Sequence, residues 1–198
     1  MNWTPPTGIA ALIFDCDGTL ADTMPIHYRA WAVMFDRLGI PFSEARFYSL
    51  GGMPTSRIFR LLADEHGHII GDDEIVRLIR AKEALFLETV HDVKPIAPVF
   101  AAAKAHRGRM PMAVASGGYR HVVTRTLTAI DAHDWFDAVV CAEDTVLHKP
   151  EPDVFLEAAR RLNVAPARCL VFEDTDLGVE AGRRAGMHTI DIRIWSGE

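Results

Sequence analysis

The sequence IFDCDGTL, residues 13–20, decides both the fold and the site. The apolar run at 10–14 predicts a short buried strand, and Asp15 and Asp17 follow it directly. Because side chains alternate in direction along an extended backbone, we expect both carboxylates to face the same small volume. Two carboxylates so close together are unfavourable unless a cation or a proton lies between them. The pair therefore predicts either a bound hard metal ion or a nucleophile beside an acid/base group.

Two other interpretations of this stretch involve no catalysis. Asp, Gly and Thr are common loop residues, so Gly18 and Thr19 are also compatible with an ordinary capped turn. An EF-hand calcium loop is excluded, because Leu20 stands at its sixth position, which needs glycine, and Ile26 stands at its twelfth, which needs glutamate. From this stretch alone, the capped turn and the functional pair both stay open.

Length, charge and cysteine content limit the class of protein. At 198 residues, with 49% hydrophobic and 24% charged residues, the composition is that of a soluble globular protein with one domain and a substantial insertion. No segment has the pattern of a signal peptide or a membrane span, so we expect no membrane partner. The net charge of −6 argues against a nucleic-acid partner. Cys16, Cys141 and Cys169 are too widely spaced for a disulfide framework, which predicts a reducing, cytoplasmic location.

Residues 23–91 show only helical patterns. In the first helix Thr23 suits the cap and Gly39 the stop, and apolar side chains recur every three or four residues. Two further helices with the same periodicity follow. The block interrupts a chain that otherwise alternates strands and helices. We therefore predict a core of residues 1–22 and 92–198 with a helical domain of residues 23–91 inserted in it.

After the insertion, strands and helices alternate. The pattern predicts strands at 111–115, 138–142, 169–172 and 189–194, separated by helical segments. Repeated units of this kind imply a parallel sheet covered on both faces, which is a doubly wound α/β fold. Ligands of such sheets bind at the carboxyl ends of the strands, so the residues that follow each strand are the candidates for the site.

Acidic residues follow two of these strands. Asp15 and Asp17 follow the first strand, and Glu173 and Asp174 follow the strand at 169–172. Four carboxylates that meet at one edge of a sheet need a cation, and a set of oxygen ligands points to Mg²⁺. Alone, the second pair would be an ordinary helix cap, so the prediction depends on the two strands lying close together.

Groups that suit a phosphate follow two other strands. Ser116 and the backbone N–H groups of the Gly117–Gly118 turn can hold phosphate oxygens, and Lys149 supplies positive charge. The chemistry that fits the combined set is phosphoryl transfer. Asp15 would attack phosphorus and form an aspartyl-phosphate, while Asp17 would protonate the leaving oxygen and later activate water.

With these motifs in this order, the chain resembles the haloacid dehalogenase superfamily of aspartate-dependent phosphotransferases. The resemblance covers nearly the whole chain and rests on residues 15–20, Ser116, residues 149–153 and the pair Glu173-Asp174. It implies that the first aspartate and the final acidic pair bind Mg²⁺ together with the backbone carbonyl of Asp17. It also implies that the helical insertion is a small cap that closes over the site.

Within the superfamily, the chain resembles the β-phosphoglucomutase branch, and in it the fructose-1-phosphate phosphatase-like group. The shared segments are residues 52–58, 109–114 and 136–140. The mutases carry an arginine shortly after a glycine of the cap, where this chain has Thr55, and Arg57 lies two residues further on. This departure favours simple hydrolysis over the mutase reaction.

The resemblance also implies which residues contact the substrate. His27, Trp31 and Lys82 resemble the substrate-facing positions of the cap, although Trp31 also fits the buried face of its helix. The residues that we expect to contact the substrate are Thr19, His27, Trp31, Gly51, Gly52, Arg57, Lys82, Ser116 and Gly117.

The leading hypothesis is a Mg²⁺-dependent phosphatase for a small phosphorylated sugar, acting as a monomer, since a monomer suffices for this chemistry. A β-phosphoglucomutase would use the same residues but would have to keep water away from the aspartyl-phosphate. A haloacid dehalogenase would need neither the metal ion nor an acid at Asp17. A non-catalytic phosphate-binding protein would not need every catalytic position filled.

Overall fold

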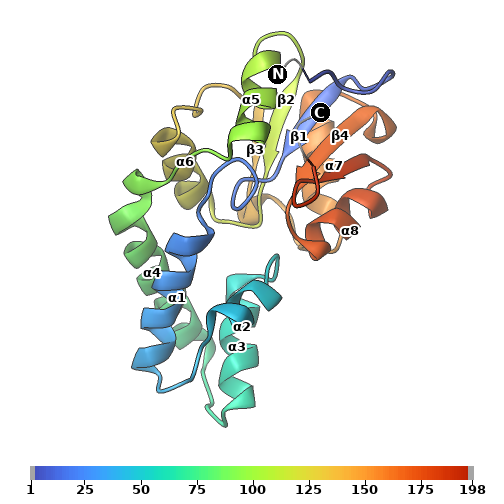
Figure 1. Cartoon of the computed structure of the whole chain (residues 1–198). Helices are drawn as coiled ribbons and strands as arrows, with labels where there is room; N and C mark the ends of the chain where they lie inside the picture. The colour runs from blue at the N-terminus through green and yellow to red at the C-terminus, as the bar shows by residue number, and fades with distance from the viewer. Residues whose placement is uncertain (1–2, 196–198) are drawn as a thin grey trace.

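The computed structural model describes residues 3–195 and contains a five-stranded parallel sheet (Figure 1). The strands lie in the order β3-β2-β1-β4-β5, with β1 at the centre. Their bounds are Ala11–Phe14 (β1), Met112–Ala115 (β2), Ala138–Val140 (β3), Cys169–Glu173 (β4) and His188–Asp191 (β5). This arrangement confirms the predicted doubly wound α/β fold.

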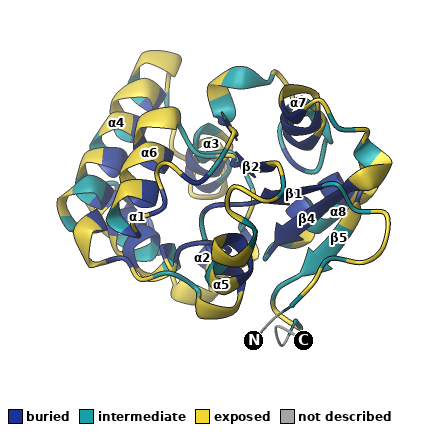
Figure 2. Ribbon diagram, turned by 90° about the horizontal axis from the view of Figure 1, so that it is seen from above, coloured by how far each residue is buried: buried dark blue, intermediate teal, exposed yellow. Residues whose placement is uncertain are grey.

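Helices cover both faces of the sheet, because alternate side chains of a strand point to opposite sides. Leu12 and Phe14 of β1 pack in an apolar cluster with α5 and α6, whereas Ala11 and Ile13 pack in a second cluster with α7 and α8. The bounds of these helices are Ala97–His106 (α5), Arg120–Ala129 (α6), Asp153–Leu162 (α7) and Asp176–Arg184 (α8). Figure 2 shows the consequence: β1, β2 and β4 are buried throughout, and the edge strand β5 is only partly covered.

Two strands, β3 and β5, end earlier than predicted. β3 ends at Val140 because the Cys141 N–H donates to Asp144 Oδ2 (2.7 Å) and opens a short 3₁₀ turn at Ala142–Asp144. β5 ends at Asp191, where the side-chain carboxylate accepts a hydrogen bond from the Arg193 backbone N–H (3.0 Å). In each case an aspartate side chain accepts a hydrogen bond from a backbone N–H group, and the chain turns at that point.

The inserted segment contains four helices, one more than predicted. They are α1 (Met24–Arg37), α2 (Glu44–Ser49), α3 (Thr55–Glu65) and α4 (Asp72–Thr89). The unpredicted α2 begins after Ser43, whose hydroxyl accepts a hydrogen bond from the Arg46 N–H (3.1 Å). The four helices, which we call the cap helices, pack around their own apolar cluster, in which Trp31 stacks on Phe35 (5.3 Å between ring centroids). Over residues 3–195, no helix is both long enough and apolar enough to cross a membrane.

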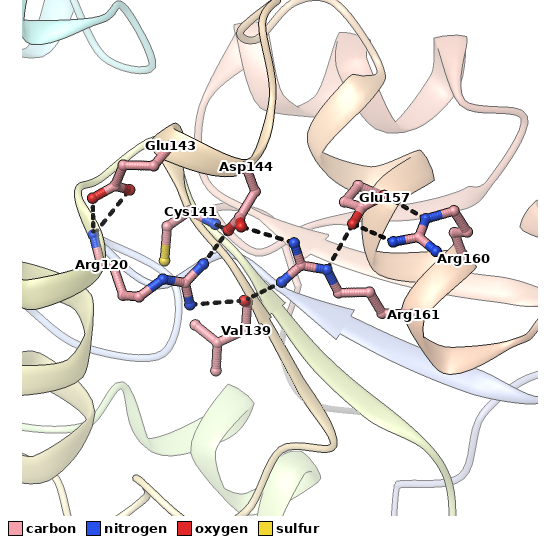
Figure 3. Close-up of polar contacts among 8 residues, drawn as sticks. All are labelled: Arg120, Val139, Cys141, Glu143, Asp144, Glu157, Arg160 and Arg161. Atoms are coloured by element: carbon pink, nitrogen blue, oxygen red, sulfur yellow. Dashed lines mark hydrogen bonds and ion pairs between the residues drawn. The ribbon is translucent and has the colours of Figure 1, made fainter.

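Ion pairs fix the loop that joins β3 to α7 (Figure 3). Asp144 accepts hydrogen bonds from Arg120 and from Arg161 Nη2 (2.8 Å). Both arginines also donate to the Val139 carbonyl, at 3.2 and 3.0 Å. Val139 belongs to the edge strand β3, so these bonds occupy a carbonyl group that another strand could otherwise pair with. The same loop carries Lys149 toward the end of the sheet, and the network therefore restrains its path.

Candidate active site

Three carboxylates meet at the carboxyl end of the central strands. Phe14 lies opposite Phe172 in the parallel register of β1 and β4, which brings the next residues, Asp15 and Glu173, side by side. One oxygen from each of Asp15, Glu173 and Asp174 lies within 4.8 Å of the other two. Asp15 is 6% exposed and Glu173 is 1% exposed, so two members of the cluster are buried, and Asp174 is half-buried.

Lys149 is a cation that faces this cluster. Its Nζ lies 2.6 Å from Asp15 Oδ1 and 2.6 Å from Glu173 Oε1. Burial by itself would lower the pKa of Lys149, but the attraction of the two carboxylates is stronger and raises the pKa above its usual range. Lys149 is therefore charged at neutral pH. One positive charge against three carboxylates still leaves the site with excess negative charge.

The excess negative charge appears in the pKa values of the carboxylates. Burial, reinforced by Glu173 and Asp174, raises the pKa of Asp15 well above its ordinary value despite the opposing attraction of Lys149. Burial and the neighbouring Glu173 raise the pKa of Asp174 to about 7. A divalent cation would relieve both shifts, and the donor set consists only of oxygens, which hard cations prefer. The residues present therefore fit a metal ion.

Small and hydroxyl residues of the first motif shape the cluster. Gly18 has a φ of +81°, and a side chain at this position would collide with the Asp174 carboxylate. Thr19 is fully buried and donates from its hydroxyl to Asp174 Oδ1 (2.9 Å). Thr19 therefore orients a member of the cluster. We expected Thr19 to contact the substrate. Instead it contacts Asp174 and is not among the residues that line the cleft.

The Asp17 carboxylate lies outside the cluster, which corrects the expectation that four carboxylates converge. It accepts a hydrogen bond from the Thr23 hydroxyl (2.8 Å) and lies 3.3 Å from His27 Nε2. β1 ends at Phe14, so the alternation of an extended strand does not continue to Asp17. Burial opposes ionisation of Asp17, but His27 and Thr23 together lower its pKa below the usual value. Thr23 thus binds Asp17 instead of capping α1 with its side chain.

His27 is fixed by a lysine from another cap helix. Lys82 Nζ on α4 lies 2.9 Å from His27 Nδ1, and the imidazole stacks on Phe86 (4.1 Å between ring centroids). Because an ammonium group only donates, Nδ1 accepts and Nε2 carries the proton that faces Asp17. Burial and the charge of Lys82 lower the pKa of His27, which keeps the ring neutral. Burial also lowers the pKa of Lys82 to about 8, although Asp17 counteracts this shift.

A cleft between the sheet edge and the cap helices holds most of the predicted site residues. Arg57, which the sequence analysis assigned to the substrate, is exposed on α3 and does not line the cleft, because the inward face of α3 carries Ile58 and Phe59 instead. The predicted residues that do line the cleft are Asp15, Asp17, His27, Trp31, Gly51, Gly52, Lys82, Ser116, Gly117, Lys149 and Glu173.

Several residues of the cleft were not predicted. Phe47 and Leu50 belong to α2 and its end, and the sequence analysis did not identify that helix. Glu83 is buried in the cleft wall, and its Oε2 lies 3.2 Å from His121 Nε2 on α6. Tyr119 lines the cleft beside it. In the sequence, Glu83 has the spacing of an ordinary charged residue on a helix surface, and only the contact between α4 and α6 reveals its position.

A protein-family comparison agrees with this geometry. The model that describes haloacid dehalogenase-like hydrolases matches residues 9–186, which include the acidic cluster, Ser116 and Lys149. The chain belongs to the haloacid dehalogenase-like hydrolases. The sequence resemblance to this family is thereby confirmed. Asp15, which directly follows the central strand β1, lies within the matched residues of this haloacid dehalogenase-like hydrolase.

Known relatives share almost the full length of this haloacid dehalogenase-like hydrolase. The chain is 36% identical over 185 residues to fructose-1-phosphate phosphatase YqaB of Escherichia coli, which covers 93% of this chain and 97% of the relative. The crystal structure of β-phosphoglucomutase from Clostridium difficile has a TM-score of 0.84 at 24% identity, covering 91% of this chain and 83% of that one, and shows the same fold. A mutant of CbbY from Rhodobacter sphaeroides, solved in complex with xylulose-(1,5)bisphosphate, has a TM-score of 0.79 at 27% identity, covering 91% and 84%.

Proposed function

We propose that the protein is a Mg²⁺-dependent phosphatase that hydrolyses a small phosphorylated sugar through an aspartyl-phosphate on Asp15. The observation that carries the proposal is the cluster of Asp15, Glu173 and Asp174, with Lys149 hydrogen-bonded to two of its members. The likeness to a fructose-1-phosphate phosphatase supports both the reaction and the substrate class. In the first step Asp15 attacks phosphorus, and the bond from phosphorus to the sugar oxygen breaks.

The residues around Asp15 hold the transferred phosphoryl group. The carboxylates of Asp15, Glu173 and Asp174, with the Asp17 backbone carbonyl that the family resemblance implies, would hold Mg²⁺, which when bound supplies positive charge to the phosphate oxygens. Ser116 is 1% exposed, and its Oγ accepts a hydrogen bond from the Gly118 N–H (3.0 Å). This bond leaves the Ser116 hydroxyl proton free to donate to a phosphate oxygen.

Asp17 would transfer protons in both steps, and it lines the same cleft as Asp15 and Ser116. Its lowered pKa leaves it ionised in the free enzyme, which is the form that accepts a proton from the attacking water in the second step. In the first step it must donate a proton to the leaving sugar oxygen. The negative charge of a bound phosphate opposes the lowering of this pKa, and so favours the protonated form when substrate is present.

The cap region supports hydrolysis over the mutase reaction. Thr55 stands where the mutases have an arginine, and Arg57 is exposed outside the cleft, so it does not replace that arginine.

We keep the division into a core of residues 1–22 and 92–198 and a cap of residues 23–91, with a monomer sufficient for activity. The free, buried cysteines among the described residues support a reducing, cytoplasmic location.

The test is a panel of hexose and pentose phosphates incubated with the protein and Mg²⁺, with released phosphate measured beside an Asp15→Asn control. We expect release from at least one sugar phosphate by the unmodified protein and none above background from the variant. Isomer conversion without phosphate release would establish a mutase instead. Absence of release from every member of the panel would refute the proposed phosphatase.

A further inference from the structure

Both lysines that line the cleft already contact other protein groups. Lys149 is bonded to two carboxylates at 2.6 Å, and Lys82 is bonded to His27. His148 is half-buried in the cleft wall and offers hydrogen bonds. Among the residues from 3 to 195 that line the cleft, none is an arginine. The cationic side chains of the cleft are thus two lysines that already contact protein groups, and no arginine among the described lining residues is present to hold a second phosphate group.

The N-terminus of α6 borders the cleft at Tyr119, and helix N-termini are natural sites for a phosphate group. Here a carboxylate already occupies it: the Arg120 backbone N–H donates to both oxygens of Glu143, at 3.0 and 3.1 Å (Figure 3). The Arg120 guanidinium is directed toward Asp144 and the Val139 carbonyl. Neither the helix end nor its arginine is available to a second anion.

A second carboxylate, that of Glu83, lies beside the N-terminal part of α6, at the junction where α4 packs against α6. Glu83 is 7% exposed, lines the cleft, and lies 3.2 Å from His121 Nε2. Burial, with repulsion from Glu143, raises the pKa of Glu83 above its ordinary value although His121 and Lys82 oppose the shift. Two carboxylates, those of Glu83 and Glu143, therefore already lie at this junction before any substrate enters.

Resting on the phosphatase function proposed above, we propose that the substrate is a monophosphate and that Glu83 and Glu143 exclude a second phosphate group from the junction between α4 and α6. The opposite end of the sugar then carries hydroxyl groups, which can donate hydrogen bonds to the Glu83 carboxylate. The fold itself does not forbid two phosphates, because the structure of CbbY was solved with a bisphosphate. The exclusion comes from the side chains of this chain, chiefly from like charge.

The experiment compares matched substrates that differ by one phosphate group. Fructose 1-phosphate is compared with fructose 1,6-bisphosphate, and glucose 1-phosphate with glucose 1,6-bisphosphate, by measuring kcat/KM for phosphate release. We expect the unmodified protein to prefer a monophosphate by about 100-fold or more. Glu83→Gln keeps the shape and removes the charge, and we expect it to reduce this preference by about tenfold, mainly through a lower KM for the bisphosphate.

Two control variants separate charge from structure. Glu88→Gln makes the same change at an exposed position of α4, and we expect it to keep the full preference. His121→Gln removes the partner of Glu83 but leaves its charge, so the preference should also persist. Thermal melting of each variant verifies its folding.

The outcomes distinguish this inference from the proposed function. Equal use of both substrates by the unmodified protein, or a preference for the bisphosphate, would overturn the inference and leave the phosphatase function intact. An unchanged preference in Glu83→Gln would overturn the role of Glu83. Phosphate release from neither member of either pair would overturn both the inference and the proposed phosphatase.

Discussion

Asp15 and Asp17 are separated by one residue in the chain, yet their surroundings are opposite. Asp15 is buried among carboxylates, with Lys149 as partner, and its pKa is raised. Asp17 is bound by Thr23 and His27 at the start of the cap helices, and its pKa is lowered. The difference shows how one short loop gives two carboxylates opposite surroundings: the strand end places Asp15 among other carboxylates beside Lys149, and the start of the first cap helix binds Asp17.

The largest effect is expected from the core side of this comparison. Asp15→Asn removes the nucleophile while it preserves the size of the side chain, and we expect kcat for phosphate release to fall by about 10⁴-fold or more. The measurement is steady-state phosphate release with the preferred sugar phosphate. Residual turnover within tenfold of the unmodified protein would assign the nucleophile to another group.

A smaller loss is expected on the cap side. Asp17→Asn removes proton transfer but keeps the backbone of the loop, and general acid/base catalysis typically contributes about 10²–10⁴-fold to kcat. The loss should be smaller for an aryl phosphate than for a sugar phosphate, because an aryl oxygen leaves without a proton. Equal losses with both substrates would contradict the role of Asp17 as acid.

Variants of the acidic cluster and of Asp17 should also differ in how much Mg²⁺ stabilises them. Binding at about 100 times Kd stabilises a protein by about 2.7 kcal/mol, which for a chain of this size raises Tm by about 5–10 °C. Glu173→Gln should remove most of this rise, whereas Asp17→Asn, whose backbone carbonyl is intact, should retain it. Glu180→Gln, a change on the surface of α8, is the matched control. A full rise in Glu173→Gln would place the metal ion elsewhere.

The smallest effect concerns Lys82, the buried cation of the cap side. Its pKa of about 8 lies below the ordinary 10.5, so between these pH values the unfolded chain binds a proton that the folded chain does not. The group therefore makes the folded protein relatively more stable as the pH rises through this window. Between pH 8 and pH 10, the free energy of unfolding of the unmodified protein should therefore increase by about 2 kcal/mol relative to that of Lys82→Met. Lys104 is exposed on α5, so Lys104→Met should show no such difference from the unmodified protein. If the free energies of unfolding of Lys82→Met and of the unmodified protein change in parallel with pH, Lys82 does not have the lowered pKa.

Much of the sheet could be predicted from sequence because its signals are local. The apolar run of β1 and the acidic pair after β4 each lie within a few residues, and the parallel register then brings Asp15 beside Glu173. Lys149 was predictable for the same reason, since it follows a strand of the same sheet. The positions of these groups therefore depend on the topology of the sheet, which the alternation of strands and helices determines.

The contacts across the cleft could not be predicted, because they join residues far apart in the chain. Asp17 is held by Thr23, which directly precedes α1, and by His27 of α1. Glu83 meets His121 only where α4 packs against α6. Sequence periodicity identifies the buried face of a helix, but it does not say which other helix that face will meet.

We propose that Asp15, and not Asp17, forms the covalent intermediate. The decisive experiment incubates Asp17→Asn with Mg²⁺ and an aryl phosphate, quenches the reaction with acid, and locates the added phosphoryl group by mass spectrometry of the peptide that contains residues 13–20. We expect a hydroxylamine-sensitive phosphoryl group on Asp15, since this variant has no other carboxylate in that stretch. An unmodified peptide during turnover, or a phosphoryl group on any other residue, would contradict it.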